Sequence, residues 1–263
     1  MKRWLVEILL AALAGVLLVV AIDSKRDPIA ILERHGGKIE RNEQGEVVGV
    51  DLHGASMSPT GQKLLHLIGL GEQRLSLSDA ALVHLKGLTN LQTLNLNGTK
   101  ITDAGLVHLK GLPNLQTLYL YGTQITAAGL VHLKGMTKLQ TLDLWDTEIT
   151  DAGLGHLKGL SNLKTLSLRD TKITDTGLGH LKGLTELQRL DLWDTKITDA
   201  GLVHLKGLTG LQTLNLEYCP KITDAGLVHL RGLSSLQTLS LHGTQITDAG
   251  LVHLKGLANL QWL

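Results

Sequence analysis

The sequence predicts an α/β solenoid bent into an arc, with a parallel β-sheet on the concave face, short helices on the convex face and a hydrophobic helix in front. Three observations predict this architecture. A 24-residue pattern recurs from residue 91 to residue 259. Each copy carries one strand signal and one helix signal. The core is predicted to be aliphatic, because the 263 residues include no Phe, 3 Tyr and 4 Trp.

Composition excludes several classes of protein. With 25 Lys and Arg against 24 Asp and Glu, the net charge is +1, so no global field attracts nucleic acid or an acidic substrate. A hydrophobic share of 43% argues against intrinsic disorder. The single cysteine, Cys219, excludes an internal disulfide framework.

The N-terminus carries a membrane-targeting segment. An uninterrupted apolar run covers residues 8–22, between Lys2 and Arg3 and a charged cluster at 23–27. A membrane span needs about 20 residues, so we expect residues 4–22 to contact the membrane and 1–26 to form an anchor or signal segment. We favour an uncleaved anchor with the repeat domain outside the cytoplasm. Cleavage near Ala21 would instead give a secreted protein.

Residues 27–63 are predicted to form an N-terminal cap and a first irregular repeat, ahead of a repeat domain at 64–263. Residues 27–35 favour a short helix, and residues 37–52 favour a hairpin that turns at 43–45. A solenoid needs such a cap because its first coil would otherwise expose an apolar face.

Each repeat opens with a strand and continues into a helix. In the first copy, Leu94 and Leu96 alternate with polar residues, as in a strand with one buried face. Thr102 or Asp103 then suits a helix start, and Gly111 suits a helix stop. One such coil buries too little apolar surface to offset the ordering of 24 residues. The coils must therefore stack.

The repeat LxxLxLxxT followed by ITDAGLxxLxGL resembles the leucine-rich repeat proteins, over about two thirds of the chain. The unit LQTLNLEYCPKITDAGL, with Cys219 and Pro220, is most similar to the cysteine-containing subclass found behind F-box domains. The resemblance implies a leucine-rich repeat solenoid. It also implies an alternative function, an F-box-type adaptor that recruits substrates for ubiquitination. The segment before the repeats is too short for an F-box and holds no Phe. Other units carry Thr where Cys219 stands, namely Thr99, Thr123, Thr147, Thr171, Thr195 and Thr244.

The strands are predicted to present columns of non-identical side chains on the concave face. Five of the seven aromatic residues fall in these columns or beside them. The first column is Thr93, Thr117, Thr141, Thr165, Arg189, Thr213 and Thr238. The second is Asn95, Tyr119, Asp143, Ser167, Asp191, Asn215 and Ser240. The third is Asn97, Tyr121, Trp145, Arg169, Trp193, Glu217 and His242.

The middle of this face is predicted to bind a partner. Neighbouring strands lie about 4.8 Å apart, which places Arg169 between Trp145 and Trp193 at cation-π distance. Surrounding carboxylates outnumber the two arginines, so we expect a protein or peptide partner with a basic or mixed patch. The alternative is that these side chains interact only with one another and serve to stiffen the sheet. The predicted contact residues are Tyr119, Tyr121, Asp143, Trp145, Asp146, Arg169, Asp170, Arg189, Asp191, Trp193, Asp194, Glu217 and Tyr218.

We expect no enzyme activity, no cofactor, no metal and no nucleic-acid partner. A histidine recurs once per helix, and a metal-dependent enzyme using this column is the remaining alternative. Zinc needs each ligand nitrogen near 2.1 Å, and packed helices about 8–10 Å apart would hold these histidines too far from one ion. The recurring aspartates suit helix starts. The sequence contains no phosphate loop and no nucleophile elbow. The histidines are His84, His108, His132, His156, His180, His204, His229 and His253.

The last four residues read as the start of another strand. Trp262 then lies on an uncapped sheet edge, and such edges pair readily with another chain. We therefore expect self-association through this edge.

Overall fold

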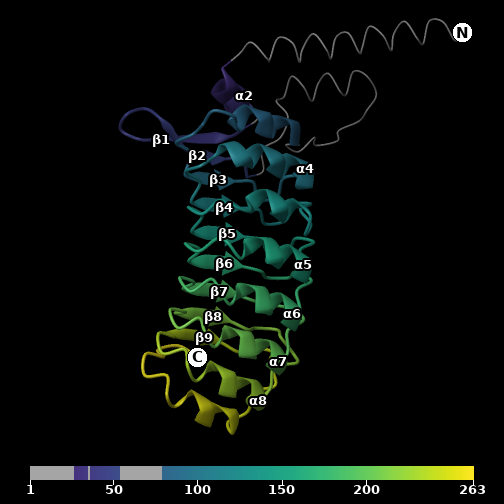
Figure 1. The fold of residues 1–263 in the computed structure, drawn as a ribbon, viewed down its shortest axis with the longest axis vertical. Helices are drawn as coiled ribbons and strands as arrows, with labels where there is room; N and C mark the ends of the chain where they lie inside the picture. Colours follow the sequence, from purple (N-terminus) through teal and green to yellow (C-terminus); the bar gives the residue numbers. More distant parts are fainter. Residues whose placement is uncertain (1–26, 35, 54–78) are drawn as a thin grey trace, which may run out of the picture.

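A computed structural model describes residues 27–34, 36–53 and 79–263. Its strands stack into one sheet that runs the length of the molecule, and the helices line the opposite side (Figure 1). The predicted solenoid is thereby confirmed. The strands are β1 (Lys38–Arg41), β2 (Val47–Asp51), β3 (Thr93–Asn95), β4 (Thr117–Tyr119), β5 (Thr141–Asp143), β6 (Thr165–Ser167), β7 (Arg189–Asp191), β8 (Thr213–Asn215) and β9 (Thr238–Ser240).

The sheet keeps the chain order from β1 to β9. β1 and β2 are antiparallel, and every later pair is parallel. Within the repeats the register advances by one whole repeat from strand to strand, so Leu94 lies beside Leu118 and Leu118 beside Leu142. Equivalent side chains therefore form straight columns across the sheet.

The core is one continuous aliphatic cluster that extends through all the described repeats. The strand leucines Leu94 and Leu96 and the helix leucines Leu106 and Leu109 are all fully buried, as are their equivalents through most of the later units. Each coil covers its neighbour's apolar edge, which is the burial that a single coil lacks.

The helices on the convex side are short, as predicted. Most comprise one α-helical turn followed by a 3₁₀ segment. Repeats spaced by the strand separation of about 4.8 Å leave little room for α-helices side by side, and the narrower 3₁₀ form fits better. The α-helices are α2 (Pro28–Arg34), α4 (Asp103–Leu106), α5 (Asp151–Leu154), α6 (Asp175–Leu178), α7 (Asp199–Leu202) and α8 (Asp224–Leu227). The 3₁₀ helices are Asp79–Leu85, Val107–Gly111, Gly129–Leu133, Gly155–Leu157, Gly179–Leu181, Val203–Leu205, Val228–Leu230 and Gly250–Leu254.

The described part of the N-terminal region contains a short helix and a hairpin ahead of the repeats. α2 buries Ile31 and Leu32 on the core, and β1 and β2 form the predicted hairpin, closed between Asn42 and Glu46. β2 also pairs in parallel with β3, so the hairpin forms the first rung of the sheet. The boundary between cap and repeats predicted at residue 63 lies outside the described residues, as does the predicted anchor at 1–26.

Within residues 27–34, 36–53 and 79–263, no helix has the length and apolarity needed to cross a bilayer. The predicted membrane segment, residues 4–22, lies outside these ranges.

A row of aspartates joins most repeats to the next one. Asp103 stands in the first turn of α4, and its carboxylate accepts both the backbone N–H and the hydroxyl of Thr126 in the following repeat, at 2.8 and 2.6 Å. Four of the threonines held in this way are the N-cap residues of α4, α6, α7 and α8, namely Thr102, Thr174, Thr198 and Thr223. The sequence indicated the helix-start role of these aspartates but not this bond between repeats. The other clamps are Asp79 to Thr102, Asp151 to Thr174, Asp175 to Thr198, Asp199 to Thr223 and Asp224 to Thr247.

One clamp is missing because Ala127 stands where the other repeats have Asp. We expect Ala127→Asp to raise the free energy of unfolding by about 1–2 kcal/mol, the value of charge-assisted hydrogen bonds discounted for exposure. The new carboxylate would reach Thr150, as Asp103 reaches Thr126. Urea unfolding measures the effect. Ala128→Asp adds the same charge one residue further on and serves as the control. Equal effects of the two substitutions would contradict the clamp.

Candidate protein-binding surface

The first two predicted columns are confirmed by the strand register. Thr165, Arg189 and Thr213 lie side by side in column one, and Ser167, Asp191 and Asn215 in column two. Tyr119 lies between Asn95 and Asp143 and is half-buried, while Arg189 is exposed. None of the column residues enters the aliphatic core.

The third column continues the ladder past the strand ends. The N–H of Asp146 donates to the carbonyl of Arg169, and the N–H of Asp170 donates to the carbonyl of Trp193, both within 3.0 Å. Trp145, Arg169 and Trp193 are thereby held one repeat apart, each half-buried against the face.

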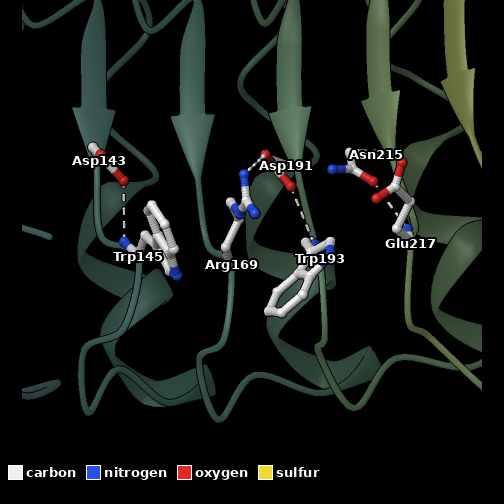
Figure 2. A network of polar contacts seen from close by, with 7 residues as sticks. All are labelled: Asp143, Trp145, Arg169, Asp191, Trp193, Asn215 and Glu217. Atoms are coloured by element: carbon white, nitrogen blue, oxygen red, sulfur yellow. Dashed lines mark hydrogen bonds and ion pairs between the residues drawn. The ribbon is translucent and has the colours of Figure 1, made fainter. Parts of the chain in front are cut away.

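Side chains of this column and of Tyr218 form a continuous row, which we call the aromatic row: Tyr121, Trp145, Arg169, Trp193, Tyr218 and His242. The Arg169 guanidinium lies 4.5 Å from the Trp145 ring centre and 5.1 Å from that of Trp193, which confirms the predicted placement (Figure 2). Tyr121 stacks on Trp145 with centroids 4.2 Å apart. At the other end, Tyr218 meets Trp193 at 5.3 Å and His242 at 5.2 Å, both edge-to-face. The row thus crosses six consecutive repeats.

Column two fixes the backbone under the row. Asp143 accepts the N–H of Trp145 at 3.1 Å, and Asp191 accepts the N–H of Trp193 at 3.1 Å. The Asn215 Oδ1 likewise accepts the N–H of Glu217 at 2.9 Å (Figure 2). The sequence analysis treated Asp143 and Asp191 only as charges. These turns could have been predicted from the sequence, because an Asp or Asn side chain commonly accepts the backbone N–H two residues later.

Arg169 is also tied to Asp191. Its Nη1 lies 3.7 Å from Asp191 Oδ2, while its buried Nε and the buried hydroxyl of Ser167 have no hydrogen-bond partner in the described chain. Burial raises the pKa of the Asp191 carboxyl, and the Trp193 N–H and the Arg169 charge only partly oppose this effect. Ionising Asp191 in the folded protein therefore costs more free energy than ionising a free carboxyl group.

We expect Asp191→Asn to stabilise the protein at pH 7 by less than about 1 kcal/mol. The substitution removes the cost of ionising a buried carboxyl group, but it also removes the ion pair with Arg169, and a half-exposed ion pair is worth at most about 1 kcal/mol. Asn keeps the acceptor for Trp193 and removes the buried charge. Because the folded pKa is raised, the wild type loses stability as the pH rises from 3.8 through that raised value, and the variant should lose less. Urea unfolding between pH 3 and 7 measures this difference. A less stable variant at pH 7 would contradict it.

Three of the predicted carboxylates lie in the turns after the row. Asp146, Asp170 and Asp194 adopt left-handed backbone angles, with φ of 52°, 48° and 48°. They line a groove together with Lys172, Lys196 and other turn residues, so both aspartates and lysines lie along this groove. The predicted excess of acid around the tryptophans is therefore smaller than the sequence suggested. The carboxylates that flank the row from column positions are Asp143, Asp191 and Glu217.

Tyr218 occupies the equivalent turn position in its repeat, with φ of 55°. Other repeats have Gly98, Gly122 and Gly243 there, and glycine adopts such angles without strain. A bulky residue in this region is a steric outlier. In this conformation the Tyr218 ring packs edge-to-face against Trp193.

The histidine column lies in the 3₁₀ segments on the convex side. In the part of the chain that the structure describes, no group of three or more His, Cys, Asp or Glu residues is placed to hold a metal ion. Burial, reinforced by the nearby Lys182 charge, lowers the pKa of His204. The expectation of no metal stays a prediction.

Comparison with known proteins decides the family. A sequence profile described as "Leucine-rich repeat region" matches residues 55–257. The chain belongs to the leucine-rich repeat proteins. The match is to the family as a whole, so the resemblance to the F-box-associated subclass and the adaptor function stay predictions. Cys219 does take the buried position of the repeat threonines, and burial raises the pKa of its thiol.

Two solved leucine-rich repeat structures from Listeria monocytogenes are similar to this chain. An internalin C2 (inlC2) matches with a TM-score of 0.61 and 26% identity, over 90% of this chain and 91% of that chain. An internalin (inlF) matches with a TM-score of 0.56 and 27% identity, over 72% of this chain and 58% of that chain. A search of curated proteins finds no match to the sequence.

Proposed function

We propose that this leucine-rich repeat protein binds another protein or a peptide through the aromatic row and catalyses no reaction. The observation that carries the proposal is the row itself. A protein with an aliphatic core places most of its aromatic side chains in one half-exposed line on the concave face. Protein interfaces are enriched in Tyr, Trp and Arg, and these residues carry most of the binding energy.

The charges beside the row favour a partner with a basic or mixed patch. Asp143, Asp191 and Glu217 flank the rings, and Arg169 and Arg189 offset part of their charge.

Site-specific photocrosslinking tests the proposal. We expect a benzophenone side chain at position 119, on the concave face, to capture a partner in cells. The same group at position 131 should not, because Val131 is exposed on the convex side. Capture from position 131 and not from 119 would overturn the proposed surface.

We also propose that residues 4–22 anchor the protein in a membrane with the repeats outside the cytoplasm, or direct its secretion if they are cleaved. The apolar run at 8–22 supports this location. Protease added to intact cells should digest anchored repeats. Full protection of cell-associated protein, with none in the medium, would contradict both forms.

We also propose that the protein self-associates, because Trp262 and Leu263 are exposed. Trp262 is 71% exposed and Leu263 62% exposed, and the Trp262 carbonyl accepts the N–H of Leu239 beside β9. A second copy could pair with this short segment. The mass by light scattering should then rise with concentration and should stop rising in Trp262→Asp. A constant monomer mass in the wild type would contradict the proposal.

A further inference from the structure

The turns that follow β5 to β8 form a groove of about 440 Å³, lined by residues that do not belong to the aromatic row. The turns after β5, β6 and β7 each contribute the residue directly after the row position and the residue two places later, and the turn after β8 contributes Pro220 and Lys221. Across the repeats the first kind forms an acidic row, Asp146, Asp170 and Asp194. The second kind is Glu148, Lys172 and Lys196, and together with Lys221 it forms a largely basic row.

The groove offers no free hydroxyl between these rows. The Thr147, Thr171 and Thr195 hydroxyls each donate to a backbone carbonyl three residues earlier, at 2.6, 2.6 and 2.8 Å. Their protons are already used, so the side-chain donors that the groove lining offers a ligand are the lysine ammonium groups.

Most of these charges have no partner among the residues that the structure describes. Lys172 pairs with Glu148 at one end of the groove. In the rest of the groove, the ammonium groups of Lys196 and Lys221 and the carboxylates of the acidic row make no ion pair or side-chain hydrogen bond with any described residue. Unpaired charges of both signs therefore lie in one concave site.

The groove depends on features that the other repeats lack. Where Gly98, Gly122 and Gly243 stand at the turn, no side chain is available to form an acidic row. At the other end, Pro220 and Lys221 come from the one 25-residue repeat and contribute to the lining. The groove is thus confined to a few consecutive repeats.

We propose that this groove binds an extended polypeptide segment of a partner protein in which basic and acidic side chains alternate. Successive side chains of an extended chain point to opposite sides, so its basic residues can face the aspartates while its acidic residues face the lysines. The acidic row disfavours a phosphate or nucleic acid, and the lysines disfavour a purely basic segment. The inference does not depend on the aromatic row.

Two synthetic peptides test the proposal on the full chain in a mild detergent. One alternates Lys and Glu over 12 residues, and the other has the same composition in two blocks. We expect the alternating peptide to bind at least about tenfold more tightly by calorimetry, and to weaken as salt rises. Equal affinity of the two peptides would overturn the proposal.

Charge reversal provides the second arm. In Lys196→Glu with Lys221→Glu, the alternating peptide should bind at least about tenfold more weakly, while an all-Lys peptide should bind more tightly than it does to the wild type. Lys158→Glu with Lys206→Glu makes the same charge change at exposed lysines outside the groove and should leave both affinities unchanged. If the groove variant fails to fold, Lys196→Gln with Lys221→Gln replaces it. Unchanged binding in a folded groove variant would overturn the proposal.

Discussion

Replacing Gly201 by Ala is expected to lower the free energy of unfolding by about 2 kcal/mol, although Ala is the better helix former by about 1 kcal/mol. A Cβ at this position would collide with Asp175 Oδ1, the oxygen that accepts the Thr198 N–H at 2.7 Å. Either the carboxylate moves and the clamp between repeats is lost, or the helix shifts from its neighbour. Overpacking of this kind costs about 1–3 kcal/mol, and the lost charged hydrogen bonds add to it.

A double-mutant cycle with Asp175→Ala isolates this collision. Removing the carboxylate makes room for the new methyl group, so the double variant should be more stable than the sum of the two single effects predicts. Gly153→Ala is the matched control. A Cβ there meets Ala127, with the nearest atom at 3.0 Å, and no clamp exists to be broken. Urea unfolding compares the four variants. If Gly201→Ala matched the wild type, or cost no more than Gly153→Ala, the clamp would not be the reason for the glycine.

Removing both tryptophans is expected to weaken partner binding by about 100- to 1,000-fold. Each aromatic residue at the centre of an interface contributes about 2 kcal/mol or more, and losing both also frees Arg169 from the two rings that hold it. Stability should change little by comparison, because both rings lie outside the aliphatic core. Calorimetry with the partner identified by crosslinking measures the dissociation constant for Trp145→Ala with Trp193→Ala.

The control for this prediction is Val107→Ala with Val131→Ala. These valines are 44% and 41% exposed on the convex side. We expect full affinity from the control. A Trp variant that folds and binds as well as the wild type would show that the row only stiffens the sheet.

The sequence alone was sufficient to predict the repeat, the strand columns, the hairpin before the repeats and the position of Arg169 between two tryptophans. All of these follow from local periodicity and from one fixed strand spacing. Because the strands stack in register, residues at equivalent positions of successive repeats form columns on the sheet. The periodicity alone therefore shows where on the sheet each residue that departs from the repeat lies.

The contacts between coils could not be predicted in the same way. Asp103 suits its own helix, and nothing in its local sequence shows that it holds Thr126 of the next repeat. The turns were missed for a related reason. Left-handed backbone is uncommon in residues other than glycine, so the local sequence around Asp146 and Tyr218 did not show these turns, or that Asp146 lines a groove away from the row.

Hydrogen-deuterium exchange of the protein with and without its partner tests the binding surface most directly. We predict slower exchange on binding at residues 143–147, 167–171, 191–195 and 215–219, which carry Trp145, Arg169, Trp193 and Tyr218 of the aromatic row and their turns. Slower exchange confined to the convex 3₁₀ segments, such as Val107–Gly111 and Val203–Leu205, would contradict the account.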